Sequence, residues 1–321
     1  MRLLFMGTPD FASVSLRALH ADGHEILAVV TRPDRPRRRQ SSPPEPSPVK
    51  IEATRLDLPV LQPDLLRDES FQGRIESLSP DVIIVVAFGR ILPPEILSIP
   101  PRWCINVHAS LLPKYRGAAP IAHAIFVGEK ITGVTTMKMD RGLDTGPILL
   151  QKECAIGLTE TTGELTVRLA DLGAELLLET LDQHVRGNLE PQRQRNAGAT
   201  LAPPLSKEEG CIDWSAPATE VAGRIRGCHP WPLAFTQLKG ETVKVLRAEV
   251  NFESPGSRSR TVAPGRIIGA DDRRIVVQCR GDSRLGILEL RFPGGGTVSA
   301  RDALNGRRIR VGDRFGAPQA K

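Results

Sequence analysis

Residues 104–147 hold the densest set of polar side chains that could carry out chemistry. Asn106 and His108 lie two positions apart where an apolar run ends, so on a strand they would face the same side. A histidine exchanges protons near neutral pH, and an asparagine amide can donate a hydrogen bond to a developing oxyanion. The pair indicates acyl transfer. The alternative is a buried, hydrogen-bonded histidine beside an asparagine that caps a turn.

Asp144 is a third candidate, because it stands in the glycine-rich segment Arg141-Gly-Leu-Asp-Thr-Gly146. Glycines let the backbone turn sharply and bring a carboxylate close to other groups. A carboxylate beside an imidazole would favour its protonated form and fix its tautomer. An ordinary Asp-containing turn is the competing interpretation. If the three side chains meet in space, they suit acyl transfer without a covalent nucleophile.

Alternating strand and helix patterns must position these residues. Apolar or β-branched runs predict strands, and one long amphipathic pattern predicts a helix over 162–186. The strands are expected at 3–6, 26–30, 82–88, 105–107 and 134–139. This order predicts an α/β doubly wound, Rossmann-like sheet covered by helices on both faces. Ligands bind beyond the carboxyl ends of such strands, where the candidate residues are expected.

The rest of the chain divides into segments of different composition. Residues 32–48 are rich in Pro, Arg and Ser and predict an exposed, mobile loop. Residues 188–206 are polar and suit a linker between an N-terminal domain, 1–187, and a C-terminal domain, 207–321. Short runs separated by turns predict a small, barrel-like β domain there. Its strands are expected at 243–246, 266–268, 275–278, 285–290 and 309–311.

Charge separates the two domains. The net charge of +6 is confined to residues 207–321, which carry 20 basic and 13 acidic residues, whereas residues 1–206 have a net charge of −1. Such asymmetry is a hint of nucleic-acid binding, although a solvated basic surface explains it equally well. Aromatic residues make up only 4% of the chain, which favours contacts with phosphates over base stacking.

Composition also excludes several classes of protein. The five cysteines include no CxxC pair, which argues against a disulfide scaffold or a Cys-based zinc site, and no metal is expected. The glycine after the first strand does not begin a GxGxxG motif, so a nicotinamide oxidoreductase is disfavoured. Apolar runs are too short for a signal peptide or a membrane span. We expect a soluble, cytoplasmic protein that is monomeric and binds no membrane.

Several longer motifs together carry a family resemblance. They are GTPDFA at 7–12, TRPDRP at 31–36, SPVK at 47–50, AFGRILP at 87–93, NVHASLLP at 106–113, RGAAPI at 116–121, MDRGLDTGP at 139–147, LSKEEGCIDWS at 205–215 and HPWPLA at 229–234. The chain resembles the formyltransferases that use 10-formyltetrahydrofolate over almost all of its length. The LSKEE and IDW motifs and the long C-terminal part are similar to the branch of the family that acts on tRNA.

This resemblance implies a fold, a reaction and a set of site residues. It implies a Rossmann-like N-terminal domain joined by a linker to an OB-like β-barrel. The catalytic set of the family matches Asn106, His108 and Asp144. The folate-facing residues match Ser110, Leu111, Leu112 and Pro113, together with Phe88, Gly89 and Ile91 of the AFGRILP segment. The implied reaction is transfer of the formyl group of 10-formyltetrahydrofolate to the α-amine of initiator methionyl-tRNA.

The sequence departs from the family pattern at two single positions and, more strongly, at the loop that follows TRPDRP. Ala109 stands where Gly is common, and Phe88 stands where Tyr is common. Relatives often carry a basic, Gly-containing loop that inserts at the tRNA acceptor end. Here the segment is PRRRQSSPPEP, and Arg37, Arg38 and Arg39 are its expected tRNA contacts. Two further functions stay open: formylation of a small amine, such as an amino sugar or a nucleotide-linked amine, and RNA binding without catalysis.

Overall fold

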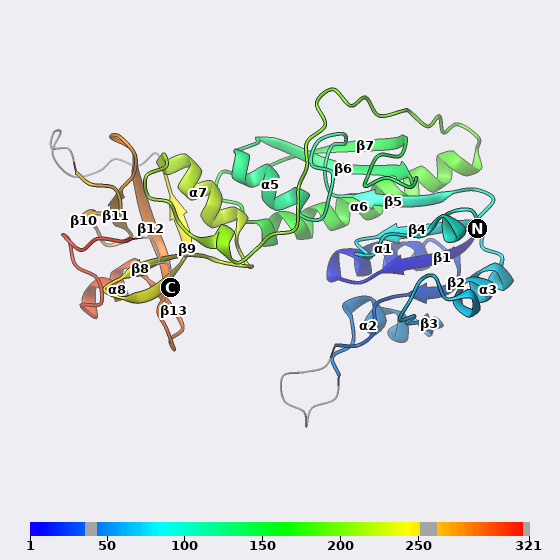
Figure 1. Cartoon of the computed structure of the whole chain (residues 1–321), viewed down its shortest axis with the longest axis horizontal. Helices are drawn as coiled ribbons and strands as arrows, with labels where there is room; N and C mark the ends of the chain where they lie inside the picture. Colours follow the sequence, from blue (N-terminus) through cyan, green and yellow to red (C-terminus); the bar gives the residue numbers. More distant parts are fainter. Residues whose placement is uncertain (36–43, 251–261, 317–321) are drawn as a thin grey trace. The chain divides into compact units, whose positions relative to one another are not determined.

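The chain folds into two units, each built on its own β-sheet (Figure 1). The computed structural model describes residues 1–35, 44–250 and 262–316. The first unit comprises residues 1–120, 131–155 and 166–203, and the second comprises residues 121–130, 156–165 and 204–321. The units therefore interleave along the sequence, and the second unit takes two short segments from the N-terminal half of the chain.

A seven-stranded sheet forms the centre of the first unit. Its strands are β1 Arg2–Gly7, β2 Glu25–Val30, β3 Val60–Leu61, β4 Val82–Val86, β5 Cys104–His108, β6 Ile131–Lys138 and β7 Ile148–Ala155. Their order is β3-β2-β1-β4-β5-β6-β7, with the first five parallel and the last two antiparallel. The Rossmann-like sheet is confirmed. Strands β3 and β7 were not predicted from the sequence.

Helices cover both faces of this sheet. They are α1 Asp10–Ala21, α2 Pro48–Arg55, α3 Glu69–Leu78, α4 Pro94–Leu97 and, from residue 166 onward, α6 Thr162–Val185. On one face, Phe71 and Ile75 of α3 join an apolar cluster with alternate residues of β1, β2 and β4. On the other face, Gly173 of α6 lies against Val107 and Val134 of the sheet and Phe11 of α1. Strands β1, β4 and β5 are buried at nearly every position, so both faces of the sheet require a cover of helices.

An antiparallel sheet is the centre of the second unit. Its strands are β8 Ala234–Leu238, β9 Glu241–Glu249, β10 Ile267–Ala270, β11 Ile275–Gln278, β12 Arg284–Arg291 and β13 Thr297–Ser299; its helices are α5 Pro120–Val127, α7 Ala218–Gly227, α8 Ala300–Asn305 and the 3-10 turn Glu208–Gly210. The order β10-β11-β12-β9-β8, with β13 beside β12, is an open path among the described residues. The β-rich texture is confirmed, whereas the OB-like barrel is not.

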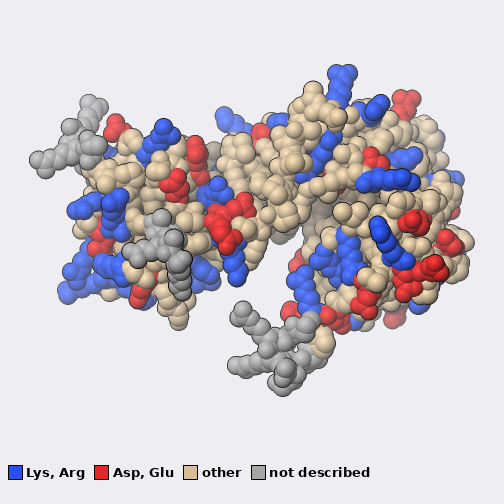
Figure 2. All heavy atoms as spheres, viewed as in Figure 1, with Lys and Arg blue, Asp and Glu red and all other residues tan. Residues whose placement is uncertain are grey.

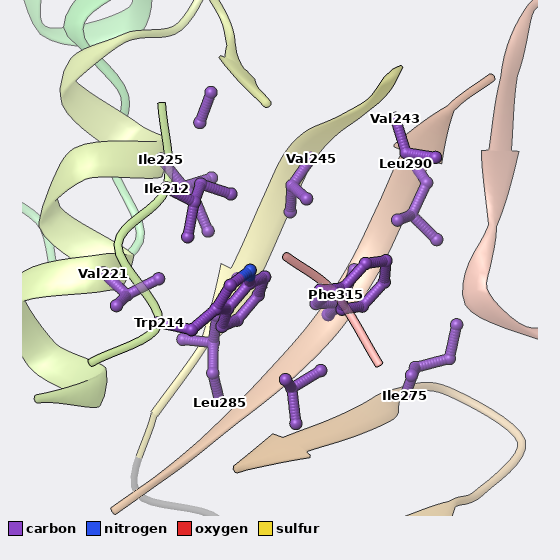
Figure 3. Packing of buried hydrophobic residues seen from close by; sticks show 14 of the residues in the cluster. Ile212, Trp214, Val221, Ile225, Val243, Val245, Ile275, Leu285, Leu290 and Phe315 are labelled. Carbon is purple, nitrogen blue, oxygen red and sulfur yellow. The ribbon is translucent and has the colours of Figure 1, made fainter. Parts of the chain in front are cut away.

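The core of the second unit is organised around one aromatic pair (Figure 3). The Trp214 and Phe315 rings are stacked with centroids 5.3 Å apart, and the Trp214 indole N–H donates a hydrogen bond to Thr236 Oγ1 at 2.9 Å. Aliphatic side chains from α7 and from the sheet surround this pair. The strand predicted at 309–311 is wrong, because Ile309 is buried by a turn after α8 rather than by strand pairing.

A buried carboxylate fastens α2 to α1 in the first unit. The Glu52 side chain is 10% exposed, and its carboxylate accepts hydrogen bonds from Arg17 of α1 and from Arg55 of its own helix. These two guanidinium groups, Arg55 more than Arg17, lower the pKa of Glu52 to about 2. The ionised form is thus favoured in the folded chain.

Among the described residues, no helix combines the length and the apolar character that crossing a membrane requires.

Replacing this carboxylate tests the link between α1 and α2. Because the pKa of Glu52 is lowered on folding, its contribution to stability is complete above its ordinary value of 4.5 and is lost as the pH falls toward 2. Glu52→Gln should lower the free energy of unfolding by about 1–2 kcal/mol at pH 7, discounted for the exposed arginines. In urea unfolding, the difference in the free energy of unfolding between this variant and the unchanged protein should be smaller at pH 3 than at pH 7.

The matched control is Glu25→Gln. Glu25 faces Arg2 at 3.8 Å on the surface, where both side chains are about half exposed or more. An exposed ion pair contributes little to stability, so this variant should differ from the unchanged protein by less than about 0.5 kcal/mol. Equal losses for Glu52→Gln and Glu25→Gln at pH 7 would contradict the role assigned to Glu52.

Candidate active site

The candidate residues lie where parallel strands of the first unit end. Strand β4 ends at Val86 and its parallel neighbour β5 ends at His108, with Val86 paired to Val107. The AFGRILP segment follows the first strand and the SLLP loop follows the second. Both segments therefore leave the sheet at its carboxyl edge, which is the edge where open α/β sheets bind ligands.

Asn106 and His108 lie on the same side of β5, as their spacing predicted. Both are buried, with exposed fractions of 9% and 6%. The His108 imidazole Nε2–H donates a hydrogen bond to the carbonyl of Tyr115 at 2.9 Å, so this nitrogen carries a hydrogen. The other ring nitrogen, Nδ1, faces Asp144 Oδ2 at 3.6 Å.

Asp144 lies at His108, although 36 positions separate the two residues in the sequence. Its backbone has a φ of 52°, in the left-handed region that aspartate tolerates better than most residues. Its Oδ2 atom also accepts a hydrogen bond from the backbone N–H of Gly117 at 2.8 Å. The carboxylate is thus held between the imidazole and a loop amide. The structure brings His108 and Asp144 together, with Asn106 two residues before His108 on β5.

The residue at position 117 must be glycine for this contact to form. Its φ is +123°, and a Cβ atom there would lie 2.5 Å from the carbonyl oxygen of Ala202. That carbonyl accepts a hydrogen bond from Ala119 N–H at 3.1 Å, and Arg116 pairs with Leu201 in a parallel bridge. A later segment of the chain therefore packs directly against the loop that supplies the Gly117 amide.

The SLLP loop is held by one buried hydroxyl. Thr135 of β6 donates from Oγ1 to the Ser110 carbonyl at 2.6 Å and accepts from the Leu112 N–H at 3.1 Å. The Gln151 side chain of β7 donates to the same hydroxyl and to the Leu112 carbonyl. Ser110 and Leu112 are buried, whereas Leu111 and Pro113 are half-buried. The two half-buried side chains are the part of this loop that a ligand can reach.

The AFGRILP residues do not share one environment. The Phe88 side chain is only 2% exposed and belongs to the apolar cluster beneath the sheet. Gly89 is exposed with a φ of +71°, and its carbonyl accepts a hydrogen bond from Arg32. Ile91 is 81% exposed. Any ligand at this turn would meet the backbone and Ile91 rather than the Phe88 ring.

The base of the basic loop is anchored by a polar cluster. Lys50 donates to Asp34 at 2.6 Å and to Gln62 at 2.8 Å, and Gln62 in turn donates to the Asp34 carboxylate and the Arg32 carbonyl. These hydrogen bonds, first of all that from Lys50, lower the pKa of Asp34. The cluster joins the TRPDRP and SPVK motifs. The predicted contacts Arg37, Arg38 and Arg39 lie outside the described residues.

Two buried residues at this site were not predicted as functional. Arg116 is 8% exposed and Gln194 is 9% exposed, and they are joined by hydrogen bonds of 3.1 and 2.7 Å. Arg116 belongs to the RGAAPI motif of the family resemblance, and this membership is the signal that could have singled it out. Gln194 gave none, because it lies in a polar stretch without periodicity that predicts a linker.

Comparison with known proteins adds the family. Residues 1–181 match the family model "Formyl transferase", and residues 204–308 match "Formyl transferase, C-terminal domain". A methionyl-tRNA formyltransferase of Heliobacterium modesticaldum is 49% identical over 98% of this chain and 100% of its own. That of Citrifermentans bemidjiense is 46% identical over 100% of this chain and 98% of its own.

Solved structures share the fold at lower identity. An N-formyltransferase from Helicobacter canadensis, in complex with folinic acid and dTDP-3-aminofucose, has a TM-score of 0.67 and 18% identity, covering 89% of this chain and 98% of its own. Methionyl-tRNA formyltransferase from Clostridium thermocellum has a TM-score of 0.54 and 17% identity, covering 78% of this chain and 94% of its own. With its Rossmann-like sheet, the two family models that match it and relatives that match almost all of its length, the chain belongs to the formyl transferase family.

Proposed function

We propose that this protein transfers the formyl group of 10-formyltetrahydrofolate to the α-amine of methionine on initiator methionyl-tRNA. The observation that carries the proposal is the contact between His108 and Asp144 at the carboxyl edge of the sheet. It occurs in a chain that is 49% identical, over the full length of both, to a methionyl-tRNA formyltransferase. The co-substrate is folate-linked, and the proposed mechanism uses no metal ion.

The reaction joins the amine nitrogen to the formyl carbon and breaks the bond between that carbon and N10 of the folate. The amine must be neutral to attack, and a free α-amino group has a pKa of about 7.7–8.0, so a useful fraction is neutral at pH 7. The amine loses a proton as the new bond forms, and N10 gains one as it leaves. A water molecule at Asp144 would carry this proton.

Asn106 and His108 would stabilise the oxyanion that forms when the amine adds. Preorganised donors in a buried site stabilise such a charge far better than water does. The Nε2 hydrogen of His108 is now donated to the Tyr115 carbonyl, and it must leave that carbonyl to reach an oxyanion. Asp144, held by Gly117 N–H, would keep the imidazolium in place while this happens.

The folate would lie against the SLLP loop and the AFGRILP turn. Leu111 and Pro113 offer apolar surface, and the backbone at Phe88 and Gly89 offers polar groups next to the exposed Ile91. The buried side chains of Phe88, Leu112 and Ser110 would support this surface from below. Thr135 fixes the loop conformation through its hydrogen bonds to Ser110 and Leu112.

The tRNA would be held by basic side chains other than those of the catalytic set. Figure 2 shows Lys and Arg side chains gathering on the second unit, at the end that carries α8 and β13. Arg301, Arg307, Arg308 and Arg310, all exposed, contribute to the charge of this region. Arginine suits phosphate because its planar group donates two parallel hydrogen bonds. Arg37, Arg38 and Arg39 would contact the acceptor end.

The domain organisation is part of the same proposal. Residues 1–187 would form the folate-binding catalytic domain, 188–206 the connecting segment and 207–321 the tRNA-binding domain. The matches of the two family models to 1–181 and 204–308 support this division. We also propose that the C-terminal sheet closes as an OB-like barrel. Bridges from Gln237 to Gly316 and from Arg266 to Arg314 support closure through the last described residues. A monomeric, cytoplasmic enzyme is proposed.

The first prediction concerns the acceptor. Purified protein should formylate initiator methionyl-tRNA with 10-formyltetrahydrofolate as donor. The measurement is the amount of labelled formylmethionine that is released from the tRNA after the reaction. A panel of amino sugars linked to nucleotides should accept no formyl group above background. Transfer to a sugar but not to tRNA would support the competing function. The solved structures of sugar formyltransferases are 15–21% identical to this chain and show only a shared fold.

The second prediction concerns the catalytic pair. His108→Ala removes an oxyanion donor and should lower kcat by on the order of 10²–10³. Asp144→Asn should lower it by a similar factor, because the amide leaves the imidazole without its negative partner. Single-turnover formylation of methionyl-tRNA measures both. A His108→Ala protein that is folded by circular dichroism and has near-normal turnover would contradict the catalytic role assigned to this residue.

The third prediction concerns the basic loop. Replacing Arg37, Arg38 and Arg39 with Ala should raise the KM for methionyl-tRNA by about tenfold or more, while the KM for the folate stays unchanged. Each lost phosphate contact should also make the affinity less dependent on salt, by about 0.9 in the slope of log K against log salt. An unchanged slope between 50 and 200 mM salt would show that these arginines do not contact phosphates.

A further inference from the structure

The segment from Gln192 to Ala202, whose composition predicted a linker, is attached to β7 and to the loops that carry Gly117 and Asp144. Its Gln192 pairs with Ile148 at the start of β7, through backbone hydrogen bonds of 2.8 Å in both directions. Its Thr200 and Ala202 pair with the loop at Arg116, which is adjacent to Gly117. Between these two attachments lies Gln194, which is buried. We call residues 192–202 the strap.

The Gln194 amide uses all of its hydrogen-bonding capacity on two loops, the one that carries Asp144 and the one that carries Arg116. Its Nε2 group donates to the carbonyl of Asp144 at 2.9 Å and to the carbonyl of Gly146 at 2.7 Å. Its Oε1 atom accepts from Arg116 Nε at 3.1 Å and from a terminal guanidinium nitrogen at 2.7 Å. A primary amide has two N–H groups and two lone pairs, so none is left over.

The chemistry of the partners fixes which way this amide points. Arginine has donors only, so it must face the amide oxygen, and backbone carbonyls have acceptors only, so they must face the amide nitrogen. The orientation therefore follows from the two neighbours. A flipped amide would set two N–H groups against a guanidinium and an oxygen against two carbonyls, all of them buried.

Within the loop, Asp140 Oδ1 accepts hydrogen bonds from Gly142 N–H at 2.9 Å and from Thr145 Oγ1 at 2.8 Å, and Gln194 adds a contact from outside it. Asp144 adopts a φ of 52°, and the residue at position 146 must be glycine, because a Cβ atom there would lie 1.8 Å from the Lys138 carbonyl oxygen. Gln194 binds the carbonyls of these same two residues, Asp144 and Gly146. The Asp144 carboxylate is held in turn by Gly117, whose own position depends on the strap at Ala202.

We propose that Gln194 is a positioning residue that sets the place of Asp144, and through it of His108, by binding the backbone carbonyls of Asp144 and Gly146. It is oriented by Arg116 and acts on the backbone of this loop. The inference rests on the proposed function, because its effect is read in formyl transfer. It assigns to the strap a role in catalysis beyond that of joining two parts of the chain.

The test uses Gln194→Glu in the full-length protein, assayed with initiator methionyl-tRNA and 10-formyltetrahydrofolate. A glutamate keeps the acceptor for Arg116 but turns an oxygen toward two carbonyl oxygens, so it breaks the loop contacts selectively. We expect kcat to fall by about 10- to 100-fold, since misplacing a reacting group by 1 Å costs about that much. KM for either substrate should change by less than about threefold.

The matched control is Gln192→Glu. Gln192 lies two residues away on the same strap, its side chain is exposed, and its contact with β7 is made by the backbone. The same chemical change there should leave kcat within about twofold of the unchanged enzyme. Gln192→Glu and Gln194→Glu with the same kcat would overturn the proposal.

A double-mutant cycle separates positioning from a general structural role. If Gln194 acts through Asp144, then Gln194→Glu should lower kcat by less than about threefold when Asp144 is already replaced by Asn. A loss as large in the Asp144→Asn protein as in the unchanged one would overturn the proposal. If Gln194→Glu does not fold, Gln194→Asn, which shortens the side chain by one methylene, carries the same expectations. Normal activity in His108→Ala would instead refute the catalytic assignment itself.

Discussion

The candidate active site depends on where a single carboxylate is held. Asp144 has a positive φ, and the residue at 146 has no room for a side chain, so the backbone of this turn is unfavourable for most sequences. Contacts from three distant parts of the chain compensate: His108 at the end of β5, the Gly117 amide, and the Gln194 side chain. Folding of the whole first unit is therefore a condition for assembling the site, because none of these contacts is local.

The residues that chemistry alone singles out could be found in the sequence. Asn106 and His108 share a strand, so their spacing placed them on one side, and the run from 104 to 107 placed that strand in the sheet. Asp144 was recognisable from its glycine neighbours. The contact between Asp144 and His108 could not be predicted from the sequence. The two residues are 36 positions apart, and the order β5-β6-β7 in the sheet, rather than their spacing in the chain, brings them together.

The features that were missed share a physical cause. Strand β7 has one buried residue among its eight, so its sequence shows no clear hydrophobic pattern. It forms a strand because it pairs with β6. Gln194 is a polar residue made buried by its partners, and polarity in a sequence predicts exposure. The opposite error occurred at Ile309, where an apolar residue is buried by a turn and predicted a strand. In each case tertiary contacts override the local pattern.

The interleaving of the two units limits how such a chain can change by recombination. The polypeptide passes from one unit to the other five times, and the second unit includes α5, whose Phe126 packs on the core formed after residue 204. Gly227 of α7 has no room for a side chain, because an added Cβ atom would lie 2.3 Å from the Phe126 ring. An exchange of the C-terminal part alone would leave the original α5 facing a foreign helix. The C-terminal parts of such chains can therefore diverge more readily by point substitution than by wholesale replacement.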